Sequence, residues 1–157
     1  AKKNGLDGFE FNKKLNALIL KGKVEGSSLI LAKPQTYVNK TGEAAAKLKN
    51  FYKVKPDQLL VIQDDLDIPF GNTKISFDKN SGGHKGIESI MRALKTKKFY
   101  RLRIGLAKPA LQKARQQSDK KRDEFVVKMV LSKFSPSEQD ELKKIFKKGH
   151  EEILQLL

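Results

Sequence analysis

Residues 59–71 read LLVIQDDLDIPFG, and this segment is the most informative one about the fold of the chain. The first part, residues 59–63, is an almost continuously apolar run, which is typical of a strand buried on both faces of a sheet. The run ends abruptly at Asp64, and carboxylates at the end of a buried strand occupy a usual position for ligand sites in open α/β sheets. We therefore predict an interior strand that delivers Asp64, Asp65 and Asp67 to a loop.

The segments around this strand alternate between strand and helix signals. Residues 15–24 and 28–33 are apolar runs separated by Glu25-Gly26, which predicts a β-hairpin. Further strands are expected over 73–77 and 100–107, and helices over 39–52, 84–94 and from Ser135 onward. Ser135 and Glu138 predict a capping box at the start of the last helix. Its buried stripe is expected to consist of Leu142, Ile145, Phe146, Ile153 and Leu156. Strands interleaved with helices predict an α/β fold, with one domain over residues 1–157 and a mixed sheet sandwiched by helices.

Positive charge dominates the composition. The 157 residues contain 33 Lys and Arg against 18 Asp and Glu, a net charge of +15. Such an excess suits a nucleic-acid partner, although a lysine-rich solvated surface or an anionic membrane surface would give the same balance. Residues 108–122 (KPALQKARQQSDKKR) concentrate this charge and have little apolar content, so we predict a mobile basic segment there.

Other classes of protein fit the composition less well. There is no cysteine, which excludes disulfides and a thiolate nucleophile and agrees with a cytoplasmic location. No stretch approaches the roughly 18 apolar residues of a membrane span, and we expect no membrane partner.

Two polar motifs allow both a structural and a functional interpretation. Residues 81–86 (SGGHKG) are a glycine-rich turn that leads into a helix, where backbone N–H groups can approach an anion or where His84 simply starts the helix. Residues 36–42 (TYVNKTG) precede another helix. Asn39 there can cap the helix or donate a hydrogen bond to a substrate oxygen.

Five segments in register resemble the peptidyl-tRNA hydrolase family. KPQTYVNKTG, VIQDDLDIPFG and SGGHKG have the order and approximate spacing of that family, at residues 33–42, 61–71 and 81–86. FYRLRIG at 99–105 and VLSKFSPSE at 130–138 are also similar to it. Each motif is weak alone, but together they cover nearly the whole chain.

The resemblance implies a translation-related hydrolase that cleaves the ester between a peptide and tRNA, as in ribosome rescue. A histidine of the family activates water as a general base, and the aspartate that orients it matches Asp64. Asn39 matches an asparagine near the scissile ester, where its amide can stabilise the developing oxyanion. Tyr37 matches an aromatic residue that contacts the tRNA end, where it can stack on a base.

Four basic residues complete the implied tRNA site. Lys74, Arg101 and Arg103 match basic positions and are expected to contact backbone phosphates. Lys85 departs from the family, which often has an asparagine there; a lysine can meet phosphate but cannot accept a hydrogen bond. We expect no metal, no cofactor and a monomer.

One part of the family pattern has no match in this chain. The family begins with a buried strand, an Asn-Pro-Gly turn and a Thr-Arg-His-Asn segment that carries the general base. Neither His84 nor His150 aligns with that histidine. We therefore expect an N-terminally incomplete fragment that is inactive or poorly soluble alone, because losing a positioned base typically lowers the rate 10²–10⁴-fold.

Two other functions remain open at this point. A non-catalytic RNA-binding relative of the same fold would keep the basic surface without the hydrolysis. A metal-dependent nuclease could use Asp64, Asp65 and Asp67, because clustered carboxylates can hold two Mg²⁺ ions.

Overall fold

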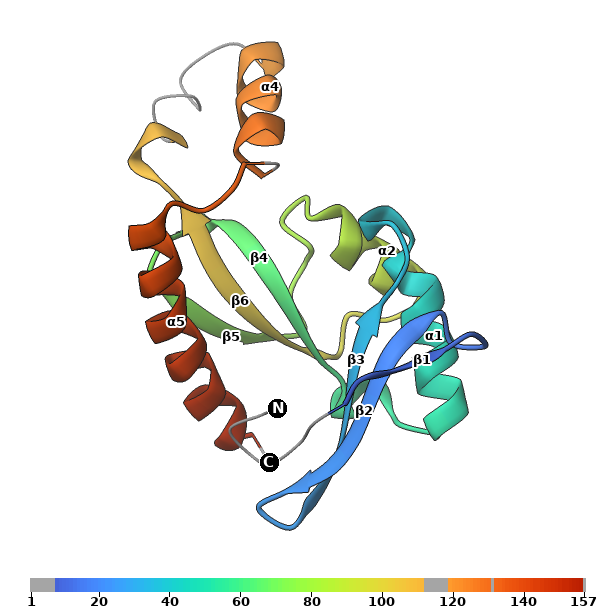
Figure 1. Cartoon of the computed structure of the whole chain (residues 1–157). Coiled ribbons are helices and arrows are strands. Elements are labelled where there is room, and N and C mark those ends of the chain that lie inside the picture. Colours follow the sequence, from blue (N-terminus) through green and yellow to red (C-terminus); the bar gives the residue numbers. More distant parts are fainter. Residues whose placement is uncertain (1–7, 112–118, 131, 157) are drawn as a thin grey trace. The chain divides into compact units, whose positions relative to one another are not determined.

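The computed structural model describes residues 8–111, 119–130 and 132–156, which fall into two units. Unit 1 joins Ala1–Leu60 to Phe77–Tyr100, and unit 2 joins Val61–Ser76 to Arg101–Leu156. The described strands form two three-stranded sheets accompanied by helices, which confirms the α/β class (Figure 1). The single domain expected over residues 1–157 stays a prediction.

The sheet of unit 1 is an antiparallel meander. It contains β1 (Glu10–Asn12), β2 (Ala17–Val24) and β3 (Ser27–Pro34), in that order. The β2–β3 register runs from Val24 opposite Ser27 to Ala17 opposite Pro34, which confirms the predicted hairpin. Glu25 and Gly26 join the strands with φ of 50° and 82°, the left-handed pair that matches the twist of a tight hairpin.

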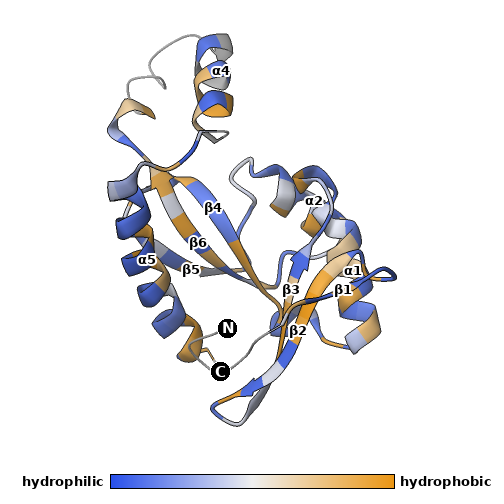
Figure 2. Cartoon of the chain, in the orientation of Figure 1, coloured by the Kyte–Doolittle hydropathy of each residue, from blue (hydrophilic) through white to orange (hydrophobic). Residues whose placement is uncertain are grey.

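Helix α1 (Thr41–Tyr52) covers the core of this unit. Leu15, Ala17 and Ile19 are buried, and Leu48 and Tyr52 on α1 pack against them with Ala32. The first half of β2 is correspondingly hydrophobic (Figure 2). The 3-10 turn η2 (Val38–Lys40) precedes α1, and η3 (Pro56–Gln58) follows it.

Helix α2 (Lys85–Leu94) packs closely on α1 because one contact position is a glycine. A Cβ on Gly42 would collide with the backbone carbonyl of Ser89. The Gly42 N–H donates to Ser89 Oγ at 3.0 Å, so a hydrogen bond fixes the same contact. The start of α1 is thereby attached to the middle of α2.

The sheet of unit 2 has the order β4–β6–β5, with bounds Leu60–Pro69 for β4, Tyr100–Ala107 for β6 and Thr73–Phe77 for β5. The expected end of the strand at residue 63 was wrong, because β4 continues through the acidic residues to Pro69. Figure 2 shows the change along β4 from a hydrophobic first half to a hydrophilic second half. Among the described strands β4 lies at an edge, and Ile62 on it is 54% exposed, so the predicted interior position is not observed.

Helix α5 (Pro136–Leu154) begins as predicted. Ser135 Oγ accepts from the N–H of Glu138, and the Glu138 carboxylate accepts from the N–H of Ser135, which forms a capping box. Its expected buried stripe is only partly observed: Ile145 is buried, whereas Phe146 is 57% exposed. The helix also meets the sheet at Gly149, which lies beside Leu102 of β6, and at Glu152, which accepts from the Thr73 hydroxyl of β5 at 2.8 Å.

The basic segment predicted at 108–122 lies partly outside the described residues, which omit 112–118. Its last residues are helical, because α4 spans Asp119–Val130. Ahead of the gap, Lys108 forms an ion pair with Glu138 at the start of α5.

Candidate functional site

The turn before α1 presents an aromatic ring and an amide to solvent. Tyr37 is 82% exposed and Val38 is 58% exposed, and Asn39 is also exposed. The expected capping role of Asn39 was wrong: it lies inside η2, and the N-cap of α1 is Lys40. The turn is held instead by Thr41, whose hydroxyl donates to the Val38 carbonyl at 2.8 Å. Asn39 therefore does not close the helix, and its side chain is exposed.

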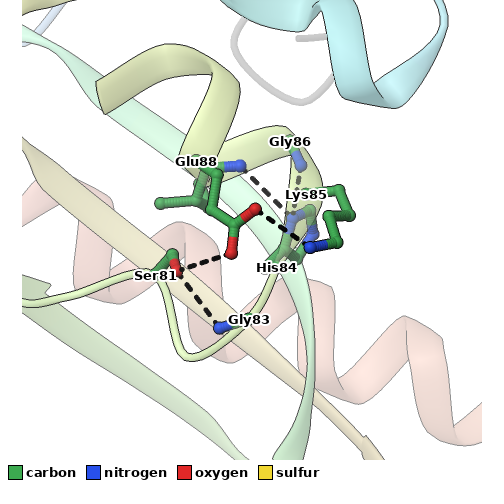
Figure 3. Close-up of polar contacts among 7 residues, drawn as sticks. Ser81, Gly83, His84, Lys85, Gly86 and Glu88 are labelled. Atoms are coloured by element: carbon green, nitrogen blue, oxygen red, sulfur yellow. Dashed lines mark hydrogen bonds and ion pairs between the residues drawn. The ribbon is translucent and has the colours of Figure 1, made fainter. Parts of the chain in front are cut away.

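The glycine corner at the start of α2 is built around His84 (Figure 3). Gly82 and Gly83 have φ of 64° and 82°, a left-handed conformation that glycine adopts without a Cβ penalty. His84 Nδ1 accepts from the N–H groups of Gly86 at 3.0 Å and Ile87 at 3.3 Å, which makes His84 the N-cap. The structural interpretation of this histidine is thus confirmed. Because Nδ1 is an acceptor, the neutral ring carries its proton on Nε2.

These two motifs are neighbours within unit 1. A Cβ on Gly86 would lie 3.1 Å from Val38 Cγ2, so the helix start and the Tyr37 turn are in close contact. The bond between Gly42 and Ser89 ties the following turns together. Tyr37, Asn39 and Lys85 therefore belong to one region, whereas Asp64, Lys74, Arg101 and Arg103 belong to unit 2.

A hollow of about 450 Å³ lies beside the Tyr37 turn. Its lining consists of Asn16, Gln35, Thr36, Tyr37, Lys40 and Glu43. Thr36 Oγ1 is buried there without a hydrogen-bond partner among the described residues. Sequence reasoning missed Asn16, which lies in a turn outside every motif, and did not single out Gln35 within the motif at residues 33–42. The two residues are brought together only in the folded chain, where the Gln35 N–H donates to the Asn16 carbonyl at 2.9 Å.

The acidic residues of β4 have different surroundings. Asp64 is exposed, whereas Asp65 is 8% exposed, as expected for neighbours on opposite faces of a strand. Asp65 Oδ2 accepts from Arg103 Nε at 2.7 Å, and Oδ1 accepts from the Asp67 N–H at 2.9 Å. The expected loop position of Asp65 was therefore wrong, because it lies on β4 and forms a partly buried ion pair inside the sheet.

The basic candidates of unit 2 also differ in exposure. Lys74 is exposed on β5, whereas Arg101 is 3% exposed. Burial lowers the pKa of Arg101, the charge of Arg103 lowers it further, and Asp65 acts in the opposite direction. A guanidinium nevertheless stays protonated at neutral pH. A phosphate contact from Arg101 would need the side chain to leave its buried position, so Lys74 and Arg103 are the stronger candidates.

The described residues contain no group of three or more His, Cys, Asp or Glu side chains that could hold a metal ion. Because Asp65 is paired with Arg103, the acidic triplet does not act as one cluster, and the nuclease alternative is not favoured. Nor does the described part of the chain include a helix long and apolar enough to cross a membrane.

Comparisons with known proteins agree with the motifs. The sequence is 42% identical over 131 residues to the peptidyl-tRNA hydrolase of Aquifex aeolicus, covering 83% of this chain and 62% of that protein. The enzyme of Lactobacillus helveticus is 41% identical over 119 residues, covering 76% and 58%. The crystal structure of the Acinetobacter baumannii enzyme matches with a TM-score of 0.76 and 27% identity, covering 92% of this chain and 67% of that one.

This chain thus spans about three fifths of the length of the first two relatives. The sequence profile of the peptidyl-tRNA hydrolase family matches residues 1–157. The family profile, the sequence relatives and the solved structure all agree, so the chain belongs to the peptidyl-tRNA hydrolase family.

Proposed function

We propose that this chain is the substrate-binding part of an enzyme that hydrolyses the ester between a peptide and tRNA in the cytoplasm. The observation that carries the proposal is the contact between the Tyr37 turn and the glycine corner, within a chain matched to the family along its whole length. Two motifs that resemble the family in sequence are distant along the chain but adjacent in unit 1. No metal or cofactor enters the proposed reaction.

In the proposed reaction a water molecule attacks the ester carbonyl, and a general-base histidine takes the proton. The exposed amide of Asn39 donates a hydrogen bond to the oxyanion that forms on the carbonyl oxygen. The bond to the ribose oxygen then breaks, and the tRNA hydroxyl leaves with a proton from the same histidine. Asp64 holds that imidazole in the useful tautomer and stabilises its cation.

Two kinds of contact are proposed to bind the tRNA. The exposed ring of Tyr37 offers a stacking surface for a base of the unpaired tRNA end. Lys74, Lys85 and Arg103 supply positive charge to phosphates, which positions the substrate without reading its sequence. Arg103 can do this while paired, because a guanidinium has five N–H donors and the bond to Asp65 uses only Nε.

The test of this proposal separates rate from affinity. The chain is fused to the strand and Thr-Arg-His-Asn segment with which the family begins, and hydrolysis of N-acetyl-aminoacyl-tRNA is followed alongside tRNA affinity. Asp64→Asn should lower the rate about 10²–10⁴-fold and leave affinity within about twofold, because it disturbs only the base. Asp67→Asn, on the same strand, is the control and should keep nearly the full rate.

Equal losses of rate and affinity in Asp64→Asn would contradict the role of Asp64. A fused chain that binds tRNA but never cleaves the ester would support the non-catalytic RNA-binding relative instead.

A further inference from the structure

One carboxylate connects the two ends of the glycine corner. Glu88 lies on the first turn of α2, and its two oxygens face different partners (Figure 3). Glu88 Oε1 accepts from the Ser81 hydroxyl at 3.4 Å, and Glu88 Oε2 accepts from Lys85 Nζ at 3.2 Å. The residue before the glycines and the first residue of the helix are therefore held by one side chain.

The glycine pair needs such a restraint. Gly82 and Gly83 have many accessible backbone conformations, and a Cβ on Gly83 would meet nothing within 4 Å. The restraint comes from Ser81, whose Oγ accepts from the Gly83 N–H at 3.1 Å. Because that hydroxyl donates its own proton to Glu88, the carboxylate fixes which lone pair Ser81 presents to Gly83. Glu88 thus acts on the loop through Ser81.

Lys85 is the second group that Glu88 controls. Its side chain is 72% exposed, and a free lysine side chain in water samples many rotamers. The ion pair with Glu88, three residues along the helix, restricts the ammonium to the first turn of α2. That position keeps the charge of Lys85 beside the loop.

We propose that Glu88 is a positioning residue for RNA binding, which holds the Ser81–Gly83 loop and the Lys85 ammonium in the arrangement that receives the tRNA end. This inference rests on the proposed function for its ligand. Glu88 itself does not touch the RNA in this scheme. A surface carboxylate without this role would only repel a polyanion, so its removal would strengthen RNA binding whatever replaced it.

The test compares two variants of equal charge. Glu88→Gln and Glu88→Ala both remove the negative charge, but only Gln keeps an oxygen in the place of Glu88 Oε1, which can accept from Ser81. With an RNA minihelix ending in CCA as the probe, Glu88→Ala should bind about threefold to tenfold more weakly than Glu88→Gln, the factor expected from one hydrogen bond. In a Ser81→Ala background the difference should shrink, because one shared partner is gone.

Glu10 supplies the matched control, since it is exposed on β1. Glu10→Ala and Glu10→Gln should bind the minihelix equally. Equal binding by the two Glu88 variants, or a difference that persists undiminished without Ser81, would overturn the proposal. Thermal unfolding of each variant shows whether a loss of RNA binding comes from the glycine corner alone or from destabilisation of the whole fold.

A second measurement needs no RNA. Amide hydrogen exchange of Gly83 in the free protein should be faster in Glu88→Ala than in Glu88→Gln, because the Ser81 hydroxyl loses its orientation only in the first. If the unsubstituted chain fails to bind the minihelix, the proposed function fails while the exchange result still decides the role of Glu88. Identical exchange in both variants would overturn that role.

Discussion

The two units of this chain use polar side chains in opposite ways. In unit 1, the side chains of His84 and Thr41 form hydrogen bonds to backbone groups of the turns in which they lie. The side chains of Tyr37 and Asn39 are exposed. In unit 2, the most conspicuous polar contact joins two charged side chains, Asp65 and Arg103, inside the sheet. The comparison shows that a charged residue within a recognised motif can have a structural role. The exposed polar groups that are candidates for binding lie instead on turns.

The largest expected effect tests the structural side of this comparison. Asp65→Ala should lower the free energy of unfolding by about 1–3 kcal/mol, because it leaves the partly buried Arg103 guanidinium without its partner. Chemical denaturation measures this loss. Asp64→Ala, at the exposed neighbouring position, should be clearly less destabilising. Equal losses at the two positions would erase the distinction between a structural and a functional aspartate.

A smaller effect is expected on the binding side. Tyr37→Ala should leave stability nearly unchanged but weaken binding of a CCA-ended minihelix about tenfold, since stacking of one base contributes roughly 1–3 kcal/mol. Fluorescence anisotropy with labelled RNA measures the affinity. Phe51→Ala removes another exposed ring of the same unit and should have little effect. If both variants bind equally well, exposed aromatic area alone does not identify the site.

The smallest effect concerns pH. The hydrogen bond from Lys108 lowers the pKa of Glu138, and the backbone N–H of Ser135 lowers it further. A carboxyl with a lowered folded pKa adds stability above its unfolded pKa of about 4.3, and this stability is lost as pH falls through the folded value. Glu138→Gln should therefore make the acid loss of stability shallower below about pH 5.

Thermal unfolding across pH, with Glu151→Gln as an exposed control on the same helix, measures that slope. An identical slope in Glu138→Gln and the unsubstituted chain would show that the Lys108 pair contributes nothing measurable.

Much of the fold was predictable because its signals are local. The positive-φ turn at Glu25-Gly26 and the capping box at Ser135 depend on residues adjacent in sequence, and both were confirmed. The apolar run at residues 59–63 was recognised as a strand, but its end was misplaced. Carboxylates normally disfavour a strand, and in β4 the pairing of Asp65 with Arg103, far away in the sequence, offsets this preference at one of them.

The candidate site was predictable in its residues but not in its contacts. Tyr37, Asn39 and Lys85 were identified from motifs, and their placement near one another depends on Gly42 and Gly86, whose missing side chains allow close packing. Periodicity carries no information about which helices approach so closely. The burial of Arg101 was unpredictable for the same reason, since strand alternation does not say which face is covered.

The most direct test of the account asks where an RNA end touches unit 1. Backbone amide chemical shifts of the chain are followed by NMR while a CCA-ended minihelix is added, with a minihelix lacking CCA as the reference. We expect the CCA-dependent changes to concentrate in residues 36–42 and 81–89. Binding that leaves these two segments unchanged, or that is indifferent to the CCA end, would contradict the account.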